Sequence, residues 1–375
     1  MIYLDNAATT FPKPKCVQEE IDRCISTYCG NPGRSGHRLS MLAAEEIYNC
    51  RAALANLFSA NPSRVVFTYN TTYALNLAIK SLYCPHSEIL ISDMEHNAVL
   101  RPVHQLFLHG EIKYRTFHPV RDADETIEEL KKRISRSTKM IVCTHASNIC
   151  GEVYPISAIG AFCKAHGISF IVDAAQSAGI CNISMKGAGI DAVCVPAHKG
   201  LYGPQGLGFV IFGEDAKPMR TLVEGGTGSH SLQRTMGTEL PDAFEAGTLS
   251  TPLIAGLHAA VNWLECTGIE EIAAHEIRLA KHIRDRLSKL NGSRFFGSPV
   301  QDSGVLLYIN EDIPLSRLAD ALDMQDVCTR SGLHCAPLAH KTLGTPPSGA
   351  LRISLGHFNT VNDCDALCEC IENLI

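Results

Sequence analysis

Short apolar runs rich in β-branched residues alternate with helix-like stretches through the first half of the chain. Each run stops at polar or turn-forming residues, as a short buried strand does. Apolar residues at helical spacing predict helices from about residue 97, over 126–134 and over 156–166. Strands that alternate with helices over about 150 residues are typical of βαβ units, so we expect an α/β fold with a mainly parallel sheet. The expected strands are 64–68, 88–92, 112–117, 140–144 and 168–173.

The pattern changes near residue 250. Two further strand-like runs, 191–195 and 207–212, end the first part, and a long helical region then extends to about residue 290. The remainder combines short strands and helices, which is typical of a smaller α+β unit. Because 375 residues is long for a single core, we expect two domains. The large domain would cover residues 15–250, and the small domain would combine residues 1–14 with 251–375.

Composition and charge argue against several classes of function. The net charge is -6 without any block of like charges, so we expect neither nucleic-acid nor membrane-surface binding. No apolar run approaches the ~20 residues needed to cross a bilayer, and the N-terminus lacks the pattern of a signal peptide. Sixteen cysteines without such a signal indicate reduced thiols, and we therefore expect a cytoplasmic protein.

An acid and an amine follow two of the expected strands. Asp173 ends the run 168–173, and His198-Lys199 comes just after the run 191–195. Ligands of open α/β sheets bind at the carboxyl ends of the strands, so both side chains would meet at one edge. A carboxylate facing a pyridinium nitrogen and a lysine that binds covalently are the groups that pyridoxal phosphate chemistry requires. An aspartate at the core edge beside an exposed lysine explains this stretch equally well, and both interpretations remain open from these residues alone.

Two loops have the composition of ligand-binding segments. Asn70-Thr71-Thr72 lies between an expected strand and a helix, where free backbone N–H groups and hydroxyls can bind an anion. A plain helix cap has the same sequence pattern. The loop C-G-N-P-G-R-S-G-H carries Arg34 and His37 and is either an active-site loop or a solvated turn.

Nine short motifs occur in the order of one enzyme family. They are L-D-N-A-A-T at 4–9, T-T at 71–72, M-E-H-N-A at 94–98, S-N at 147–148, V-D-A-A-Q at 172–176, H-K at 198–199, F-E-A-G-T at 244–248, R-S-G-L-H-C-A-P at 330–337 and L-R-I-S at 351–354. In this order they resemble the class V aminotransferase-like branch of the fold-type I pyridoxal phosphate enzymes, and within it the cysteine desulfurase and selenocysteine lyase family. The resemblance is to the subgroup with an R-x-G-x-H-C-A-x-P loop and a short N-terminus. It implies a large domain with a mainly parallel seven-stranded sheet and a smaller α+β C-terminal domain that carries the catalytic cysteine loop.

The resemblance assigns cofactor contacts to residues of suitable type. Lys199 would bind pyridoxal 5'-phosphate covalently and act as the base at the substrate's Cα. Asp173 would keep the pyridinium nitrogen protonated, and the catalytic His96 would stack on the ring. The other implied cofactor contacts are Gln176 and Asn148 near the phenolic oxygen, Thr71, Thr72 and His198 at the phosphate, and Thr248 at the phosphate of the other subunit. This last contact implies a homodimer with composite active sites.

The resemblance also implies how the substrate binds. Arg352 would pair bidentately with the α-carboxylate, a geometry that suits guanidinium better than ammonium. The further candidates for substrate contact are Asn148, Arg330 and His37.

Cys335 is the expected nucleophile among the sixteen cysteines. Its loop is bounded by Gly332 and Pro337. The neighbouring His334 and Arg330 provide cationic surroundings, which favour the thiolate. The resemblance implies that this thiolate takes the sulfur of L-cysteine as a persulfide, releases L-alanine and passes the sulfur to an acceptor protein.

Three residues depart from the family pattern. Pro196 and Ala197 stand where relatives usually have serine and glycine, so one hydroxyl that could bind the phosphate is missing. Leu333 stands where many relatives have a second histidine, and this difference concerns substrate and acceptor preference.

The C-terminal cysteines do not predict a metal site. Cys364 and Cys368 share one helix face, but Cys370 points elsewhere, and no C-x-x-C pair is present. We therefore expect no bound metal.

Three alternatives to a cysteine desulfurase follow from the same residues. A selenocysteine lyase, which acts on L-selenocysteine and supplies selenium to an acceptor, shares every motif. Another class V aminotransferase or epimerase would have no use for a thiol at Cys335. A catalytically silent scaffold that binds a sulfur carrier would be expected to lack Lys199 or Asp173, and both are present.

Overall fold

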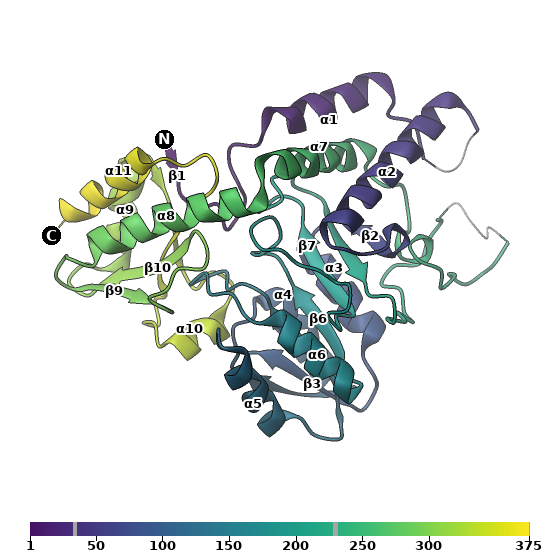
Figure 1. The fold of residues 1–375 in the computed structure, drawn as a ribbon, viewed down its shortest axis with the longest axis horizontal. Helices are drawn as coiled ribbons and strands as arrows, with labels where there is room; N and C mark the ends of the chain where they lie inside the picture. The colour runs from purple at the N-terminus through teal and green to yellow at the C-terminus, as the bar shows by residue number, and fades with distance from the viewer. Residues whose placement is uncertain (33–35, 228–231, 375) are drawn as a thin grey trace.

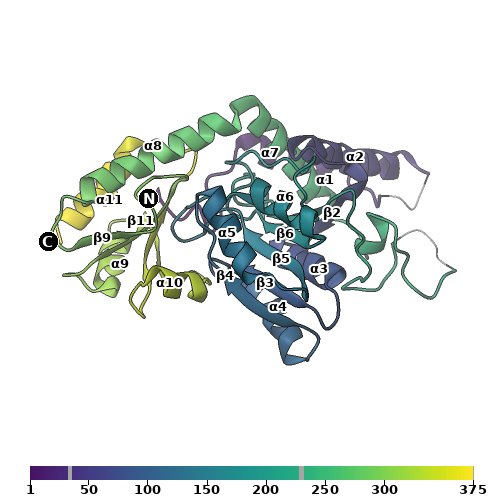
Figure 2. The ribbon, with the colours of Figure 1, turned by 60° about the horizontal axis from the view of Figure 1, so that its bottom comes forward.

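The computed structural model describes residues 1–32, 36–227 and 232–374. A large α/β part holds a wide sheet with helices on both sides, and a smaller part contains both ends of the chain (Figure 1). The long helix α8 (Ile269–Leu287) runs along the smaller part, as Figure 2 shows from another side.

A seven-stranded sheet forms the centre of the large part. Within it, β8 runs antiparallel to both neighbours and the other neighbouring strands are parallel. The expected α/β fold with a mainly parallel seven-stranded sheet is therefore confirmed. The strands in spatial order are β2 (Val65–Thr68), β8 (Gly208–Phe212), β7 (Ala192–Pro196), β6 (Ser169–Asp173), β5 (Thr138–Thr144), β3 (Glu88–Ser92) and β4 (Lys113–Phe117).

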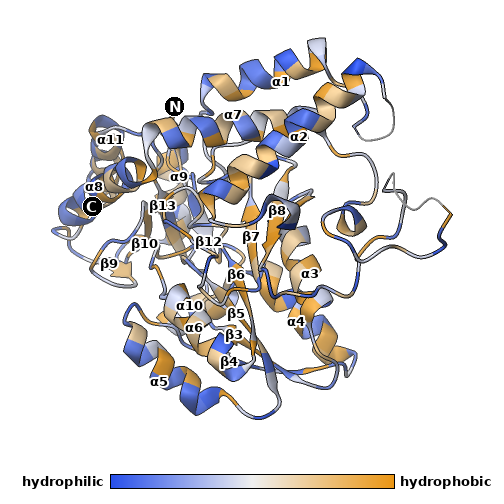
Figure 3. Ribbon diagram, turned by 45° about the vertical axis from the view of Figure 1, so that its right-hand side comes forward, coloured by the Kyte–Doolittle hydropathy of each residue, from blue (hydrophilic) through white to orange (hydrophobic). Residues whose placement is uncertain are grey.

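Alternate side chains of these strands supply two apolar layers, one on each face of the sheet. On one face the layer is completed by α3 (Thr71–Leu82) and α4 (Asn97–Leu108). The other face is covered by α2 (Arg38–Leu57), α5 (Ala123–Arg133), α6 (Ile156–His166) and α7 (Thr251–Thr267). The apolar strands lie between these helices in Figure 3. Burial on both faces explains why the inner strands read as nearly continuous apolar runs in the sequence, whereas the edge strand β4 is partly exposed.

The smaller part has its own core and its own sheet. In this four-stranded antiparallel sheet, β12 (Arg330–Gly332) pairs with β13 (Ala350–Ser354), and β10 (Val305–Asn310) lies between β13 and β9 (Ser293–Phe296). The N-terminal strand β1 (Ile2–Tyr3) pairs with β11 (Val327–Cys328). The helices of this part are α8, α9 (Leu315–Met324), α10 (Pro337–Leu343) and α11 (Val361–Glu372).

The helical region after residue 250 differs from the sequence prediction. It consists of α7 and α8, because Gly268 between them has a φ of 88°, which does not fit an α-helix. α7 packs on α2 and on α1 (Lys15–Thr27), whereas α8 packs on α11. The domain boundary near residue 250 stays a prediction. No helix in the described ranges has the length and apolar composition needed to cross a membrane.

Candidate active site

Asp173 ends β6, and Lys199 follows the neighbouring parallel strand β7, at the same edge of the sheet. Asp173 is buried, and its Oδ1 accepts a hydrogen bond from the N–H of Ala175 at 2.9 Å. Burial raises the pKa of Asp173, and the Ala175 hydrogen bond and Lys199 oppose the rise. Burial lowers the pKa of Lys199 to about 8, and Asp173 opposes that shift. The structure thus brings the predicted acid and amine close enough to interact electrostatically.

The turn between β3 and α4 adds an uncharged imidazole. His96 caps α4, because its Nδ1 accepts a hydrogen bond from the N–H of Ala98 at 3.0 Å. The neutral ring therefore carries its proton on Nε2. Burial, assisted by the charge of Lys199, lowers the pKa of His96 to about 4. A neutral aromatic ring near the lysine suits the predicted stacking on a cofactor.

Glu95 is a buried carboxyl group beside this site that was not among the residues predicted from the sequence. Its Oε1 accepts hydrogen bonds from the Ser92 hydroxyl and the Thr144 N–H, both at 2.6 Å. Burial raises the pKa of Glu95 to about 8, and the charge of Asp173 contributes to the rise. Glu95 is thus mainly protonated at neutral pH. Its position inside the M-E-H-N-A motif is the only signal that the sequence offered.

The start of α3 and the His198 turn provide polar groups without a partner. Thr71 Oγ1 and His198 Nδ1 are both buried and have no hydrogen-bond partner within the described ranges. Burial, and then Lys199, lowers the pKa of His198 to about 4. Thr72 is exposed at the same helix end. The first N–H groups of a helix are free, so this region can bind a phosphate.

The N-terminal segment holds the His198 turn in place. The carbonyl of His198 accepts hydrogen bonds from Lys13 Nζ at 2.7 Å and from Thr9 Oγ1 at 3.1 Å. Gln176 Nε2 donates to the carbonyl of Ala7 at 2.9 Å. Burial lowers the pKa of Lys13 to about 7. Lys13 is thus a further contact of this turn that was not predicted from the sequence.

Arg352 lies buried in β13 and contacts two other segments. Its Nη2 is 2.6 Å from Asp5 Oδ1, and its Nη1 donates to the carbonyl of Asn148 at 3.1 Å. Burial lowers the pKa of Arg352, and Asp5 opposes this shift. The Nε of Arg352 has no hydrogen-bond partner in the described part of the chain. The predicted carboxylate-binding residue thus has a carboxylate of the protein beside it, which the sequence did not indicate.

Cys335 is exposed on the cysteine loop (residues 330–337), and this loop reaches the large part. The Asn97 N–H, at the start of α4, donates to the carbonyl of Cys335 at 2.7 Å. Arg330 Nη2 lies 3.8 Å from the Cys335 sulfur. Pro337 directly follows Ala336, so the loop is one residue shorter than the R-x-G-x-H-C-A-x-P pattern. The backbone of the predicted nucleophile is therefore fixed at Asn97, the residue that follows His96.

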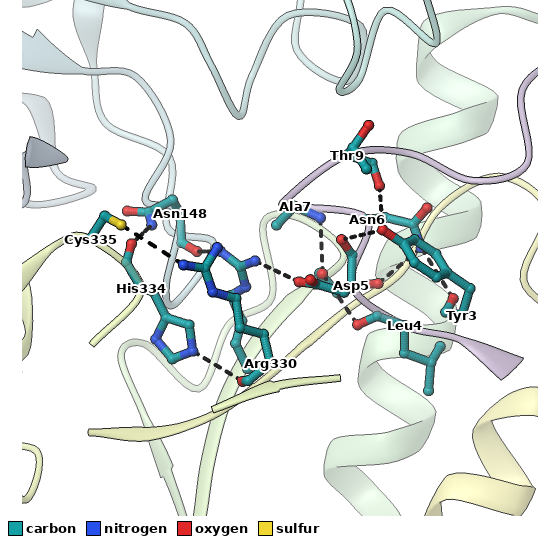
Figure 4. A network of polar contacts seen from close by, with 12 residues as sticks. Tyr3, Leu4, Asp5, Asn6, Ala7, Thr9, Asn148, Arg330, His334 and Cys335 are labelled. Carbon is teal, nitrogen blue, oxygen red and sulfur yellow. Dashed lines mark hydrogen bonds and ion pairs between the residues drawn. The ribbon is translucent and has the colours of Figure 1, made fainter. Parts of the chain in front are cut away.

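Asn148 joins the cysteine loop to the arginine. Its Nδ2 donates to the carbonyl of His334 at 3.0 Å, while its own carbonyl accepts from Arg352. Figure 4 shows these contacts between the cysteine loop on one side and Asp5 on the other. Asn148 thus lies between the predicted nucleophile and the predicted carboxylate site.

Two of the predicted site residues lie on the protein surface. Thr248 is exposed and lines a pocket with Tyr69 and Tyr73, beside the start of α3. His37 is exposed and caps α2 by accepting from the Ser40 N–H at 3.2 Å. Arg34, in the same loop, lies outside the described residues. Across the described ranges, no group of three or more His, Cys, Asp or Glu side chains could hold a metal ion.

The residues present fit pyridoxal phosphate. The site has a buried carboxylate, a lysine of lowered pKa and a neutral aromatic ring at one sheet edge. Thr71 and His198 add buried polar atoms that a phosphate would satisfy. These are the groups needed to bind the pyridinium, the aldehyde carbon, the ring face and the phosphate.

Known proteins match this chain over nearly its whole length. The family model "Aminotransferase class-V" matches residues 2–367. A probable cysteine desulfurase of Halalkalibacterium halodurans is 34% identical over 99% of this chain and 92% of its own length. The cysteine desulfurase of Haloferax volcanii is 31% identical over 99% of this chain and 89% of its own length. The apo structure of a cysteine desulfurase from Thermococcus onnurineus NA1 matches with a TM-score of 0.90 and 29% identity, covering 100% of this chain and 94% of its own.

Proposed function

The chain belongs to the aminotransferase class-V family, and we propose that it is a cysteine desulfurase that converts L-cysteine to L-alanine. The cofactor of this family is pyridoxal phosphate, which when bound supplies a conjugated ring that withdraws electrons from the substrate's Cα. One observation carries the proposal. The 2.7 Å hydrogen bond from the Asn97 N–H to the Cys335 carbonyl ties the cysteine loop to the start of α4, where His96 precedes Asn97 and interacts with Lys199.

Arg352 binds and orients the substrate in this proposal. A guanidinium presents a planar fork of N–H donors that matches a carboxylate. The buried Arg352 contacts Asp5 and Asn148, so its own orientation is fixed before the substrate arrives. The substrate's carboxylate is thereby directed to the same side of the sheet edge as Lys199, whose pKa is lowered mainly by burial and further by the charge of Arg352.

Lys199 moves the Cα proton. Its pKa of about 8 leaves a useful fraction of the amine uncharged near neutral pH, as a base requires. Thr71, Thr72, His198, Gln176 and Thr248 are the proposed contacts that hold the cofactor. The neutral ring of His96 is the proposed stacking partner.

Cys335 then accepts the sulfur. Its thiolate attacks the sulfur atom of the substrate, a new S–S bond forms, and the bond between the substrate's Cβ and sulfur breaks. The electron pair of that bond stays with the carbon skeleton, which takes up a proton and leaves as L-alanine. Arg330 Nη2 lies 3.8 Å from this sulfur, so its positive charge faces the reacting atom. The persulfide on Cys335 passes its outer sulfur to an acceptor.

A homodimer is part of the proposal. The exposed Thr248, beside Tyr69 and Tyr73, supports a contact across a subunit interface. The acceptor protein and the cytoplasmic location stay predictions.

Release of L-alanine by the purified holoenzyme tests the proposed function. The assay compares L-cysteine with L-selenocysteine, in wild type and in Cys335→Ala. Turnover of L-cysteine that the variant loses supports the desulfurase. Turnover of L-selenocysteine alone, retained in the variant, would replace the proposed desulfurase activity with that of a selenocysteine lyase.

A further inference from the structure

Two buried histidines and a threonine form a chain of hydrogen bonds behind the cysteine loop. His334 Nε2 is 3.1 Å from the carbonyl of Arg330, and His334 Nδ1 is 3.1 Å from His340 Nε2. His340 Nδ1 is 2.8 Å from Thr345 Oγ1, the shortest contact of that hydroxyl. Both imidazoles are only 2–3% exposed and lie nearly parallel. The proposed reaction gives no role to His340 or Thr345.

The direction of each hydrogen bond in this chain follows from the Arg330 carbonyl. A carbonyl only accepts, so His334 Nε2 carries a proton, and the Nδ1 of the neutral ring is an acceptor. His340 Nε2 must therefore donate to His334, which leaves His340 Nδ1 to accept from the Thr345 hydroxyl. Burial lowers the pKa of His334 to about 3 and that of His340 to about 4, so both rings are neutral. Arg352 and Arg330, the charged groups that face His334, act in the same direction.

The hydrogen bonds from Thr345 through His340 to His334 end on the strained part of the cysteine loop. His334 and Cys335 have φ values of 50° and 57°, in the left-handed region that residues with a side chain rarely adopt. Such a conformation persists only where surrounding contacts hold it. The imidazole of His334 holds the Arg330 backbone, and the Arg330 side chain lies 3.8 Å from the Cys335 sulfur. Loss of these hydrogen bonds would therefore release the cysteine loop and the Arg330 side chain together.

We propose that His340 is a positioning residue for Cys335: with Thr345 it fixes the tautomer of His334, and through His334 it holds the cysteine loop and Arg330 in place. The role of the thiol in turnover rests on the proposed function, but the positioning does not. Within the described ranges, the hydrogen bonds of the His340 ring go to His334 and Thr345 and to no residue assigned to the substrate or the cofactor, so its loss would change the sulfur step and spare substrate binding.

Two substitutions of His340 separate this role from simple packing. The side-chain amide of His340→Gln can still donate to His334 Nδ1, whereas His340→Leu fills the space and donates nothing. We expect the kcat for alanine release from L-cysteine to fall about 100-fold in His340→Leu, since small displacements of a reacting group have effects of this size. KM should stay within about 2-fold, because Arg352 is unchanged. His340→Gln should restore most of the kcat.

Alkylation of Cys335 by iodoacetamide, resolved by peptide mass spectrometry, is independent of turnover. Cys84 and Cys266, which are also exposed, serve as internal controls. We expect His340→Leu to slow alkylation of Cys335 by about 10-fold at neutral pH, because release of the loop separates the reacting sulfur from the positive charge of Arg330. His340→Gln should react like wild type. If wild type releases no alanine, the proposed function fails, and the alkylation rates still decide on the positioning role.

Thr345→Val and Thr345→Ser provide a second pair in case His340→Leu does not fold. Valine removes the hydroxyl that selects the tautomer of His340, and serine keeps it. We expect Thr345→Val to lower kcat and to slow the alkylation of Cys335, whereas Thr345→Ser should match wild type in both. The proposal would be overturned if kcat and the alkylation rate were those of wild type in both His340→Leu and Thr345→Val. It would also be overturned if His340→Gln were as slow as His340→Leu.

Discussion

Asp5 and Arg352 form an ion pair within the candidate active site, with 2.6 Å between Asp5 Oδ1 and Arg352 Nη2. The pair joins the N-terminal segment to the C-terminal strand β13, and the arginine is only 2% exposed. A buried cation without a counter-charge is unfavourable. Asp5 therefore balances the charge of Arg352 before a substrate carboxylate binds there.

Replacement of Asp5 by asparagine should destabilise the substrate-free protein. Removing one partner of a buried ion pair typically lowers the free energy of unfolding by about 3 kcal/mol. The product L-alanine supplies a carboxylate, so it should raise the melting temperature of Asp5→Asn more than that of wild type. Thermal unfolding of both holoproteins with and without L-alanine measures the loss of stability and the rise in melting temperature. Equal melting temperatures without the ligand would show that Asp5 does not balance Arg352.

Replacement of Arg352 by lysine keeps the charge and loses the planar fork. A charge-assisted bidentate contact contributes about 2–3 kcal/mol, so KM for L-cysteine should rise about 100-fold, with a smaller effect on kcat. Steady-state kinetics of alanine release tests this expectation. A KM close to the wild-type value would remove Arg352 from the substrate site.

The attachment of pyridoxal phosphate to the apoprotein should depend on pH through Lys199. Only the unprotonated amine reacts with an aldehyde, and the pKa of Lys199 is lowered from 10.5 to about 8. The rate of attachment should rise about tenfold per pH unit below pH 8 and level off above it. Visible absorbance follows the reaction, with Lys199→Ala as the control that forms no covalent product. A rate that keeps rising to pH 10 would mean that the lysine has an ordinary pKa.

Replacement of Glu95 by glutamine should change how stability depends on pH. The pKa of Glu95 is raised from 4.5 to about 8, so between these values the unfolded chain has lost a proton that the folded chain keeps. Wild type therefore loses stability relative to Glu95→Gln as pH rises from 5 to 8, by about 1 kcal/mol per pH unit. Glutamine keeps the acceptor for Ser92 and Thr144. Urea unfolding of both proteins at pH 5 and pH 8 measures the difference, and parallel pH profiles would contradict it.

Much of the fold was readable from the sequence because buried parallel strands leave a strong apolar signal. The positions of Asp173 and Lys199 follow from strand ends, and those of His96 and Cys335 from motifs of the family. Their partners were not predictable. Asp5 and Arg352 are separated by 347 positions in the chain, so no local spacing indicates their contact.

Local backbone geometry limited the prediction elsewhere. The strand β12 has three residues, two of them exposed, and it lies at the edge of its sheet, so it lacks the alternation that marks longer strands. The break between α7 and α8 depends on the positive φ of Gly268. Apolar periodicity continues on both sides of that residue and concealed the break.

The mass of the peptide that carries Cys335 gives the most direct test of sulfur transfer to this residue. The holoenzyme is mixed with L-cysteine without reductant, digested and compared with Cys335→Ser. We expect one added sulfur atom on the Cys335 peptide for each molecule of L-alanine released in the first turnover, and neither product in the variant. Release of L-alanine with an unmodified Cys335, or continued turnover in Cys335→Ser, would contradict it.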